Sequence, residues 1–572
     1  MRENANRTVE QAVVWNTIDW KTVNRTVRNL RQRIFRATQE GDWDKVQSLQ
    51  RLMLRSTSNA AQSVRKVTQI NHGKDTPGVD KLTVKTPAER GKLLRELINY
   101  TPWRAKPVKR VYIPKANGKE RPLGIPVIRD RALQAMVKNA LEPSWEARFE
   151  ASSYGFRPGR SCQDAMMHIW LTASAKHKAW VLDADIRGCF DNINHDHLLE
   201  TIGVFPAKEL IRQWLKAGYV EYGKRYETLI GTPQGGVISP LLANISLHGM
   251  EQALNIRHGK NGKPRLPNNY AVIRYADDFA VMCRTEQDAL KAQEILSEWL
   301  TIRGLQLSLE KTRIVHLKEG FDFLGFNIRF YPNAKAKTGQ KVLIKPSKKS
   351  VLKIRKRLRD EMLNYNGHNV TSLVIHLNPI IRGWANYFRT QVSSKIFSQL
   401  DDFLFNREVR FVKRLHPNKP RYWRKARYFG KRNPYREDKW VFGDKEHPEI
   451  YMYRFHWTKI QRHTKVKGTA SPDDPNLSWY WEARELNKIK TMLPKPAQLA
   501  QRQRGKCPLC GESLFNDENI EQHHIIRRDE GGSDTLDNLV LLHLYCHQQV
   551  TATQRKALRE FRQQTNEVQQ LV

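Results

Sequence analysis

Two apolar runs of the sequence contain aspartates, whose carboxylates can bind divalent cations. Residues 181–191 read VLDADIRGCFD and contain Asp185. Residues 270–283 read YAVIRYADDFAVMC and contain Asp277 and Asp278 at their centre. Apolar and β-branched residues dominate both runs, which predicts strands, with a hairpin that places Asp277 and Asp278 at its tip.

Adjacent carboxylates at a strand turn repel one another, and a divalent cation between them relieves the repulsion. If Asp185 lies on a neighbouring strand, the three carboxylates form a site for two Mg²⁺ ions. One ion would activate a primer 3′-hydroxyl, and the other would hold a triphosphate and its leaving group. The three residues together therefore predict nucleotidyl transfer, whereas an isolated acidic pair would be read as a solvated turn.

A second set of candidate ligands lies near residue 546. Cys507 and Cys510 form a CxxC pair, and His543 and Cys546 repeat that spacing in HLYCH. Three thiolates and one imidazole make a plausible tetrahedral zinc site. The remaining cysteines are scattered, so we do not expect a disulfide framework.

The composition bounds the class of protein. The 572 residues exceed the roughly 250–300 at which single cores stop growing, so several domains are expected. A formal net charge of +40 opposes compaction by self-repulsion, and a large polyanion such as nucleic acid would neutralise it. The sequence has no apolar run long enough to span a bilayer and opens on no signal peptide, so no membrane partner is expected.

The elements that must position these groups follow from periodicity and chain breakers. Residues 18–65 predict basic helices that are interrupted at Gly41 and Asp42. Residues 106–330 alternate strand-like and helix-like segments, which indicates a mixed α/β core. Three helical patterns follow and favour a small bundle, and they open at Ser347, at Asn378-Pro379 and at Ser394.

Basic and aromatic residues gather after the mixed core. The helix that opens at Ser347 offers a phosphate-facing surface through Lys348, Lys349, Lys353, Arg355, Lys356 and Arg357. Residues 415–470 interleave Tyr, Trp, Arg and Lys, a composition suited to phosphates and exposed bases, although the sequence does not say which rings stack and which pack inward. Residues 471–476, SPDDPN, predict a turn or linker.

These motifs together resemble the group II intron-encoded proteins, which are reverse transcriptases and maturases, here with a C-terminal HNH endonuclease. The resemblance rests on YADD (275–278), GTPQGGVISPLLANI (231–245), LGIPVIRDR (123–131), SYGFRPGRS (153–161) and DFLGF (322–326). It implies that Asp185, Asp277 and Asp278 are the catalytic Mg²⁺ ligands, with Tyr275 as part of their motif. The neighbouring Asp183 and Asp191 fall off these positions and are expected to be structural.

The resemblance also implies a dNTP site. Lys115 and Arg121 flank a turn, where two cations can clamp a triphosphate. Phe190 matches the position whose ring blocks a 2′-hydroxyl, and Gln234 belongs to the tight segment, with Gly235 and Gly236, beneath template and nucleotide. Lys311 matches a later core motif.

The C-terminal segment resembles an HNH endonuclease. The resemblance implies that His524 is the general base, that His523 and His547 hold a catalytic divalent metal, with Mg²⁺ expected, and that Asn538 orients the hairpin or the base. Two alternatives stay open. His543 and His547 could exchange roles at the zinc site, and the unit could be a structural zinc knuckle that binds DNA without cutting it.

The implied fold is multidomain α/β (α+β): a right-hand polymerase fingers-palm with a helical thumb, a basic DNA-binding region and a small zinc-bearing ββα HNH domain. The expected parts are an N-terminal RNA-binding extension, the fingers-palm, the thumb or maturase bundle, the DNA-binding region and the endonuclease, over residues 1–80, 81–340, 341–414, 415–498 and 499–572.

The implied function is retrohoming. The protein would bind its group II intron RNA, assist splicing, nick target DNA and copy the intron from dNTPs, in the cytoplasm or nucleoid of a prokaryote or in an organelle. The sequence leaves the oligomeric state open. A non-catalytic splicing cofactor and a host-domesticated reverse transcriptase serving defence are the rivals. The acidic triad opposes the first, and the endonuclease and maturase-like segments oppose the second.

Overall fold

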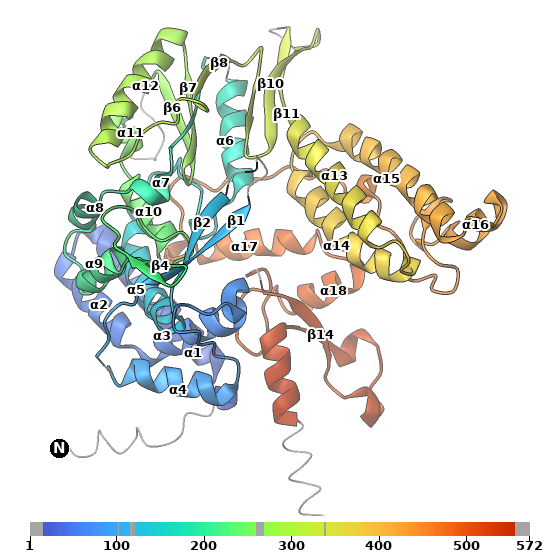
Figure 1. The fold of residues 1–572 in the computed structure, drawn as a ribbon, viewed down its shortest axis with the longest axis horizontal. Helices are drawn as coiled ribbons and strands as arrows, with labels where there is room; N and C mark the ends of the chain where they lie inside the picture. The colour runs from blue at the N-terminus through green and yellow to red at the C-terminus, as the bar shows by residue number, and fades with distance from the viewer. Residues whose placement is uncertain are drawn as a thin grey trace, which may run out of the picture.

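The structure is a computed structural model that describes residues 15–100, 102–114, 118, 120–175, 177–258, 268–336, 339–516 and 518–554. Figure 1 shows a body of helices and sheets, a helical arm that projects from its side, and a smaller C-terminal unit beside the N-terminal helices. Within the described residues, none of the helices combines the length and apolarity needed to cross a bilayer.

Amphipathic helices open the described chain, and the predicted break between them is confirmed. Gly41, in the left-handed region at φ 74°, ends the first helix, and the Asp42 side chain caps the second. Three N-terminal helices pack on a long buried helix, α5. The elements are α1 (Trp20–Glu40), α2 (Trp43–Arg55), α3 (Thr57–Arg65), α4 (Pro87–Ile98) and α5 (Ile128–Glu146).

Two four-stranded sheets form the body. The first has the order β2-β1-β4-β5, and the second has the order β6-β7-β3-β8 with every neighbouring pair antiparallel. The strands of the first are β1 (Val108–Pro114), β2 (Glu120–Ile125), β4 (Tyr219–Glu221) and β5 (Lys224–Tyr226). Those of the second are β3 (Trp180–Asp185), β6 (Tyr270–Tyr275), β7 (Asp278–Cys283) and β8 (Arg313–His316).

The second sheet is buried on both faces, which fixes its register. Along β7, Phe279 and Val281 face one apolar cluster, whereas Ala280 and Met282 face another. A slip by one residue would exchange the two faces, so the position of Asp278 at the start of β7 is strongly specified. The helices around the sheets are α6 (Cys162–Ser174), α7 (Cys189–Asn192), α8 (His195–Ile202), α9 (Lys208–Lys216), α10 (Ser239–Ser246), α11 (Met250–Ala253) and α12 (Glu286–Thr301).

A three-stranded sheet of order β11-β10-β9 leads into the arm. The predicted cap is confirmed, because the Ser347 hydroxyl accepts a hydrogen bond from the Ser350 N–H at the start of α13. The elements are β9 (Phe321–Phe323), β10 (Phe326–Pro332), β11 (Gln340–Pro346), α13 (Lys348–Asn364), α14 (Val370–Phe388), α15 (Ser394–Leu415), α16 (Arg421–Tyr428), β12 (Phe429–Gly430) and β13 (Val441–Phe442).

The predicted start of the second arm helix at Asn378-Pro379 is wrong. The α14 helix begins at Val370, where the Asn369 side chain caps it, and Pro379 lies inside the helix. Proline removes one helical hydrogen bond, but Leu373 and Leu377 are buried before it, and this packing outweighs the local penalty. Asn378 instead holds a distant segment, because it bonds the backbone of Tyr451 and Tyr453.

Residues 471–476 form a turn, as predicted, but they are packed against the body and are no solvated linker. Arg31 of α1 donates two hydrogen bonds to the Asp473 carboxylate, at 2.8 and 2.7 Å, and a third to Glu142 of α5 at 3.0 Å. All three side chains are mostly buried. The turn therefore ties α1 and α5 to the helices that follow it, α17 (Ser478–Ile489) and α18 (Pro494–Arg502).

The C-terminal unit is a hairpin followed by a helix. Strands β14 (Ile520–His524) and β15 (Leu539–His543) pair antiparallel, and residues 544–554 are helical. This arrangement matches the ββα unit that the sequence predicts.

Replacement of Arg31 by Met should destabilise the protein by about 3 kcal/mol, because it leaves the buried Asp473 carboxylate without its cation. The measurement is the urea midpoint of the unfolding transition that includes α1. Arg212→Ala is the matched control, since the Arg212–Glu209 pair is exposed and should contribute less than about 1 kcal/mol. Equal midpoint shifts in the two variants would show that the buried pair is not needed.

Candidate functional site

The three predicted carboxylates meet at one end of the second sheet. Asp185, the last residue of β3, lies directly opposite Asp278, the first residue of β7. Ala276 and Asp277 form the two-residue turn between β6 and β7, with Ala276 at φ 59°. Tyr275 pairs with Asp278 across that turn. The hairpin tip and the neighbouring strand are thus arranged as the sequence predicts.

Buried neighbours hold the turn in place. The Arg274 guanidinium donates hydrogen bonds to the Asn244 side chain at 2.9 Å and to the Ala276 carbonyl at 3.2 Å. Gly155 lies so close to the Ala276 backbone that a Cβ on it would collide. The motif SYGFRPGRS therefore supports the acidic turn through its glycine, and the turn cannot move without disturbing the sheet.

The carboxylates are electrostatically poised for cations. Burial, followed by repulsion from Asp277 and Asp185, raises the pKa of Asp278 to about 7. Burial also raises the pKa of Asp277. The ammonium of Lys311 contacts the Asp185 carboxylate, so one positive charge already balances part of the cluster. Oxygen ligands that repel one another in a partly desolvated site suit Mg²⁺.

A chain of polar side chains links the first sheet to Asp191 of α7, the helix that follows β3. Arg121 of β2 donates to the Gln234 side-chain oxygen at 2.6 Å, and Gln234 donates to the Asp191 carboxylate at 3.1 Å. The Gly124 N–H bonds the Gln234 carbonyl at 2.8 Å, which holds the segment containing Gly235 against β2. Lys115, the other predicted triphosphate clamp, lies outside the described residues.

Phe190 lies on α7, five residues after Asp185, and 7% of it is exposed. Its ring meets that of Phe156 edge to face at 6.3 Å between centroids. The ring is therefore packed in the apolar cluster that covers one face of the second sheet, which is compatible with both the predicted steric role and ordinary core packing.

The predicted nuclease residues gather on the C-terminal hairpin and helix. His523 and His547 face one another, with ring centroids 5.0 Å apart. His524 bonds the Asp534 carboxylate at 2.6 Å, and His547 bonds Glu521. Asn538 donates to the carbonyls of Ile526 and Ser533 and accepts from the Ile526 N–H. Asn538 therefore orients the hairpin connection, one of its two predicted roles.

Four side chains form a compact ligand set beside the hairpin. The ligand atoms of Cys507, Cys510, His543 and Cys546 all lie within 4.8 Å of one another, and all four residues are buried. His543 donates from Nε2 to the Ser513 carbonyl at 3.0 Å, which leaves Nδ1, 3.3 Å from Cys510 Sγ, as the ligating nitrogen. His543, and not His547, thus lies with the cysteines.

Several residues of the site escaped the sequence analysis. The acidic turn is bonded by Arg274, and the predicted nuclease histidines His524 and His547 are bonded by Asp534 and Glu521. No local motif encodes the geometry of these contacts. Arg274 in particular reads as a surface residue, since Arg is seldom fully buried, yet it is 1% exposed. Only the packing of Tyr154–Gly155 and Asn244 around it reveals its position.

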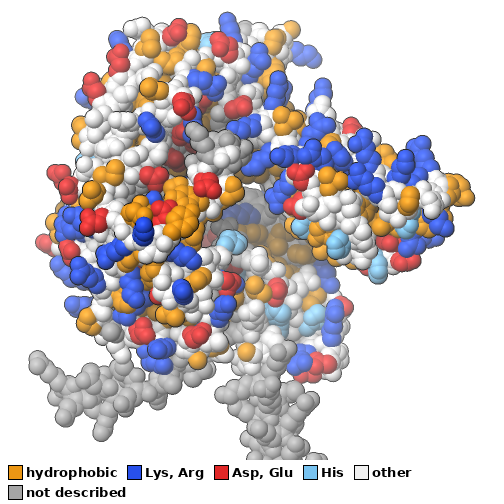
Figure 2. Space-filling model, viewed as in Figure 1, with side chains coloured by type: hydrophobic (Ala, Val, Ile, Leu, Met, Phe, Trp, Pro, Cys, Tyr) orange, Lys and Arg blue, Asp and Glu red, His pale blue; other side chains and the backbone are white. Residues whose placement is uncertain are grey.

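The arm presents the predicted basic face. Figure 2 shows Lys and Arg side chains gathered along the upper edge of the arm, from its base to its tip. The α13 helix carries six exposed cations, Lys348, Lys349, Lys353, Arg355, Lys356 and Arg357. A row of exposed cations on one helix is the electrostatic pattern of a phosphate-binding surface.

Exposure sorts the aromatic residues of the segment that follows the arm helices. Tyr428, Phe455 and Trp457 are buried and belong to the core. Tyr422 and Tyr435 are exposed, at 76% and 79%, and Lys425 lies 4.2 Å from the ring centre of the partly exposed Trp440. Exposed rings beside cations are the features that stack on bases.

Four family models match the chain in the order of these parts. They are the N-terminal domain of reverse transcriptase (residues 15–97), reverse transcriptase, RNA-dependent DNA polymerase (113–328), the group II intron maturase-specific domain (351–429) and HNH endonuclease (507–553). The carboxylate cluster lies in the second match, the basic α13 in the third, and the histidines and cysteines in the fourth.

Curated relatives agree with the family models. "Protein YkfC" of Escherichia coli (strain K12) is 35% identical over 46% of this chain and 78% of its own length. "Group II intron-encoded protein LtrA" of Lactococcus lactis subsp. cremoris is 32% identical over 48% of this chain and 55% of its own length. A 91 kDa protein in the cob intron of Schizosaccharomyces pombe is 30% identical, and the match spans 44% of that protein. The chain thus spans about half the length of the latter two.

Proposed function

This chain belongs to the family of group II intron-encoded reverse transcriptases, and from that membership we propose that it copies its intron RNA into DNA at a target site that it helps to cleave. The observation that carries the proposal is the pairing of Asp185 with Asp278 across β3 and β7, beside Asp277. Reverse transcriptase, maturase and HNH domains all occur in this one chain.

The polymerase reaction uses the carboxylate cluster. Two Mg²⁺ ions held by Asp185, Asp277 and Asp278 would supply the Lewis acidity that activates the primer 3′-hydroxyl and stabilises the leaving phosphate. Lys311, which contacts Asp185, adds positive charge where the triphosphate would lie. Lys115 and Arg121 clamp the triphosphate, and Gln234 holds Arg121 in orientation.

Phe190 selects the sugar of the incoming nucleotide. Its ring is buried and contacts that of Phe156, and it follows Asp185 by five residues, so it would form a wall of the nucleotide site. A 2′-hydroxyl would collide with this wall, whereas the 2′ position of a dNTP leaves room for the ring.

The parts around the polymerase bind nucleic acid. We assign residues 1–80 to an RNA-binding extension, 81–340 to fingers and palm, 341–414 to a thumb or maturase bundle, 415–498 to DNA binding and 499–572 to the endonuclease. The exposed cations of α13 and the exposed rings of the fourth part support phosphate contact and base stacking with the intron RNA and the target DNA.

The endonuclease reaction uses the histidines of the hairpin. Asp534 keeps a proton on one ring nitrogen of His524, so the other nitrogen is basic and can take a proton from water. A divalent metal held by His523 and His547 would stabilise the negative charge on the cleaved phosphate. The Cys507, Cys510, His543 and Cys546 set binds a structural Zn²⁺, since it is closed and buried.

These activities form one sequence of events. The protein binds the intron RNA and assists its splicing, and the RNA enters one strand of the target DNA. The HNH domain nicks the other strand, and the polymerase extends the new 3′ end with the intron as template.

Replacement of Asp277 by Ala should lower primer extension on an RNA template with dNTPs and Mg²⁺ by at least about 10³-fold, or about 4 kcal/mol, because one cation ligand is lost. Binding and splicing of the intron RNA should stay at the wild-type level. Retained extension would remove the basis of the polymerase proposal, and an equal loss of splicing would contradict the separation of the two tasks.

Replacement of Phe190 by Val should reduce the preference for dNTPs over rNTPs by about 10- to 200-fold, the range that a small change in an apolar contact produces. The measurement is kcat/KM for each nucleotide in single-nucleotide extension. An unchanged ratio, together with a loss of thermal stability, would identify Phe190 as a packing residue.

Replacement of His524 by Ala should slow nicking of a target DNA duplex by about 10²- to 10⁴-fold, the contribution of a general base. Extension of a supplied primer by the same preparation should continue at the wild-type rate. Persistent nicking by the variant would show that another residue is the base. A wild-type protein that binds zinc and DNA but does not nick DNA would support the zinc-knuckle alternative.

A further inference from the structure

The buried cysteines of the C-terminal unit are part of a core that they share with the N-terminal helices. One apolar cluster contains Trp20 of α1, Val64 of α3 and Leu94 of α4 together with Cys507, Cys510 and Cys546. These two groups of residues are more than 400 positions apart in the sequence. The ligand set is therefore enclosed on one side by another part of the protein and does not form an independent zinc knuckle.

Arg65, the last residue of α3, reaches into the ligand set. Its Nη2 lies 3.1 Å from Cys546 Sγ and 3.6 Å from a carboxylate oxygen of Glu518, and its guanidinium lies over the Trp20 ring at 4.5 Å. The residue is 4% exposed. A zinc ion with three thiolates and a neutral imidazole carries one net negative charge, and a buried charge needs a partner. Arg65 provides that partner.

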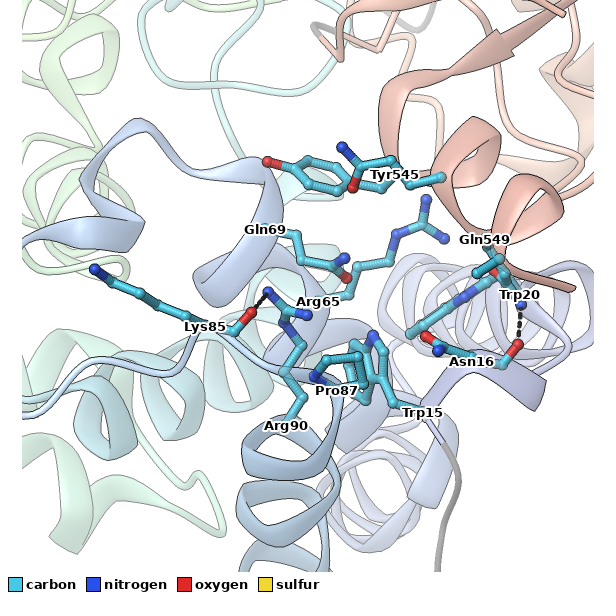
Figure 3. Close-up of a pocket in the computed structure, with 12 residues that line it drawn as sticks. Trp15, Asn16, Trp20, Arg65, Gln69, Lys85, Pro87, Arg90, Tyr545 and Gln549 are labelled. Carbon is cyan, nitrogen blue, oxygen red and sulfur yellow. Dashed lines mark hydrogen bonds between the residues drawn. The ribbon is translucent and has the colours of Figure 1, made fainter. Parts of the chain in front are cut away.

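Further polar contacts surround Arg65 and join the same two parts. Asn24 of α1 donates to the Cys510 carbonyl at 3.2 Å, within the CxxC turn itself. Gln549 donates to the Asn16 carbonyl at 2.8 Å, and Arg28 pairs with Glu512. Figure 3 shows Tyr545 and Gln549 of the C-terminal unit lining a cavity of about 300 Å³ together with Arg65 and Trp20 of the N-terminal helices. Because this cavity interrupts the apolar packing, the contacts of Arg65, Asn24 and Gln549 matter for the docking of the two parts, whereas the exposed Arg28–Glu512 pair contributes little.

We propose that zinc binding and the docking of the endonuclease unit onto the N-terminal helices are coupled, with Arg65 as the positioning residue that links them through its hydrogen bond to the Cys546 thiolate. The inference rests on the zinc site proposed above. Zinc would hold Cys546 and the CxxC turn in fixed positions, where Arg65 and Asn24 contact them. Without zinc, both contacts lose that fixed geometry, and the docking of the two parts weakens.

The first test compares zinc release from Arg65→Met with that from the wild-type full-length protein. Residues that hydrogen-bond metal ligands typically change metal affinity by about 10- to 100-fold, so release to an excess of a chromogenic chelator should be faster by that factor. Arg28→Met is the matched control, since Arg28 lies at the same junction but its pair with Glu512 is exposed and touches no ligand. Equal release from Arg65→Met, Arg28→Met and wild type would overturn the proposal.

The second test needs no variant and therefore holds even if Arg65→Met fails to fold. Hydrogen–deuterium exchange of the wild-type protein is measured with zinc and after removal of zinc by chelation. Peptides of α1 and α3, which contain no zinc ligand, should exchange faster after zinc removal, whereas peptides of α13 should not change. Loosening confined to residues 507–546 would overturn the coupling.

Zinc analysis separates this inference from the proposal on which it depends. If the purified protein holds about one zinc per chain and the rate of zinc release is the same in Arg65→Met and wild type, the coupling is wrong and the zinc site is supported. If Cys507→Ser and Cys546→Ser leave the metal content and the exchange pattern unchanged, the zinc site itself is wrong.

Discussion

The pairing of β3 with β7 is the constraint on which the rest of the structure depends. It brings Asp185 opposite Asp278 and, through the tight turn, beside Asp277, although the carboxylates repel one another. The repulsion is tolerated because the sheet is buried on both faces, where Phe279 and Met282 fix the register from opposite sides. An arrangement that is unfavourable locally is thus stabilised by apolar packing that surrounds it.

Negative and positive charges are separated between the buried sheet and the exposed surface. The acidic cluster lies at the end of a buried sheet, whereas the cations that raise the net charge to +40 lie on exposed surfaces such as α13. A phosphate backbone on the arm would therefore meet a local region of negative charge at the carboxylates, where Lys311 and Arg121 supply positive charge. Charge separation of this kind would let one protein hold a polyanion and still gather divalent cations.

Much of the site could be predicted from the sequence, because its motifs are local. Asp277 and Asp278 are adjacent, and an apolar run marks each strand. The Cys507–Cys510 pair and the His543–Cys546 pair likewise share one local spacing. The start of α14 could not be predicted in this way, since a proline after Asn378 locally favours a helix start, and only the burial of Leu373 and Leu377 reverses that preference. Arg274 and Arg65 could not be found at all, because their partners are set by tertiary contacts.

The shared core of the N-terminal helices and the cysteine-bearing unit has a consequence for biosynthesis. Trp20 and Val64 leave the ribosome early, but their partners near Cys546 are made roughly 500 residues later. At about 5–20 residues per second, the delay is about 25–100 seconds. During this interval the nascent chain presents an uncovered aromatic face. An early-bound intron transcript or a chaperone that shields this face would protect the unfinished polypeptide from aggregation.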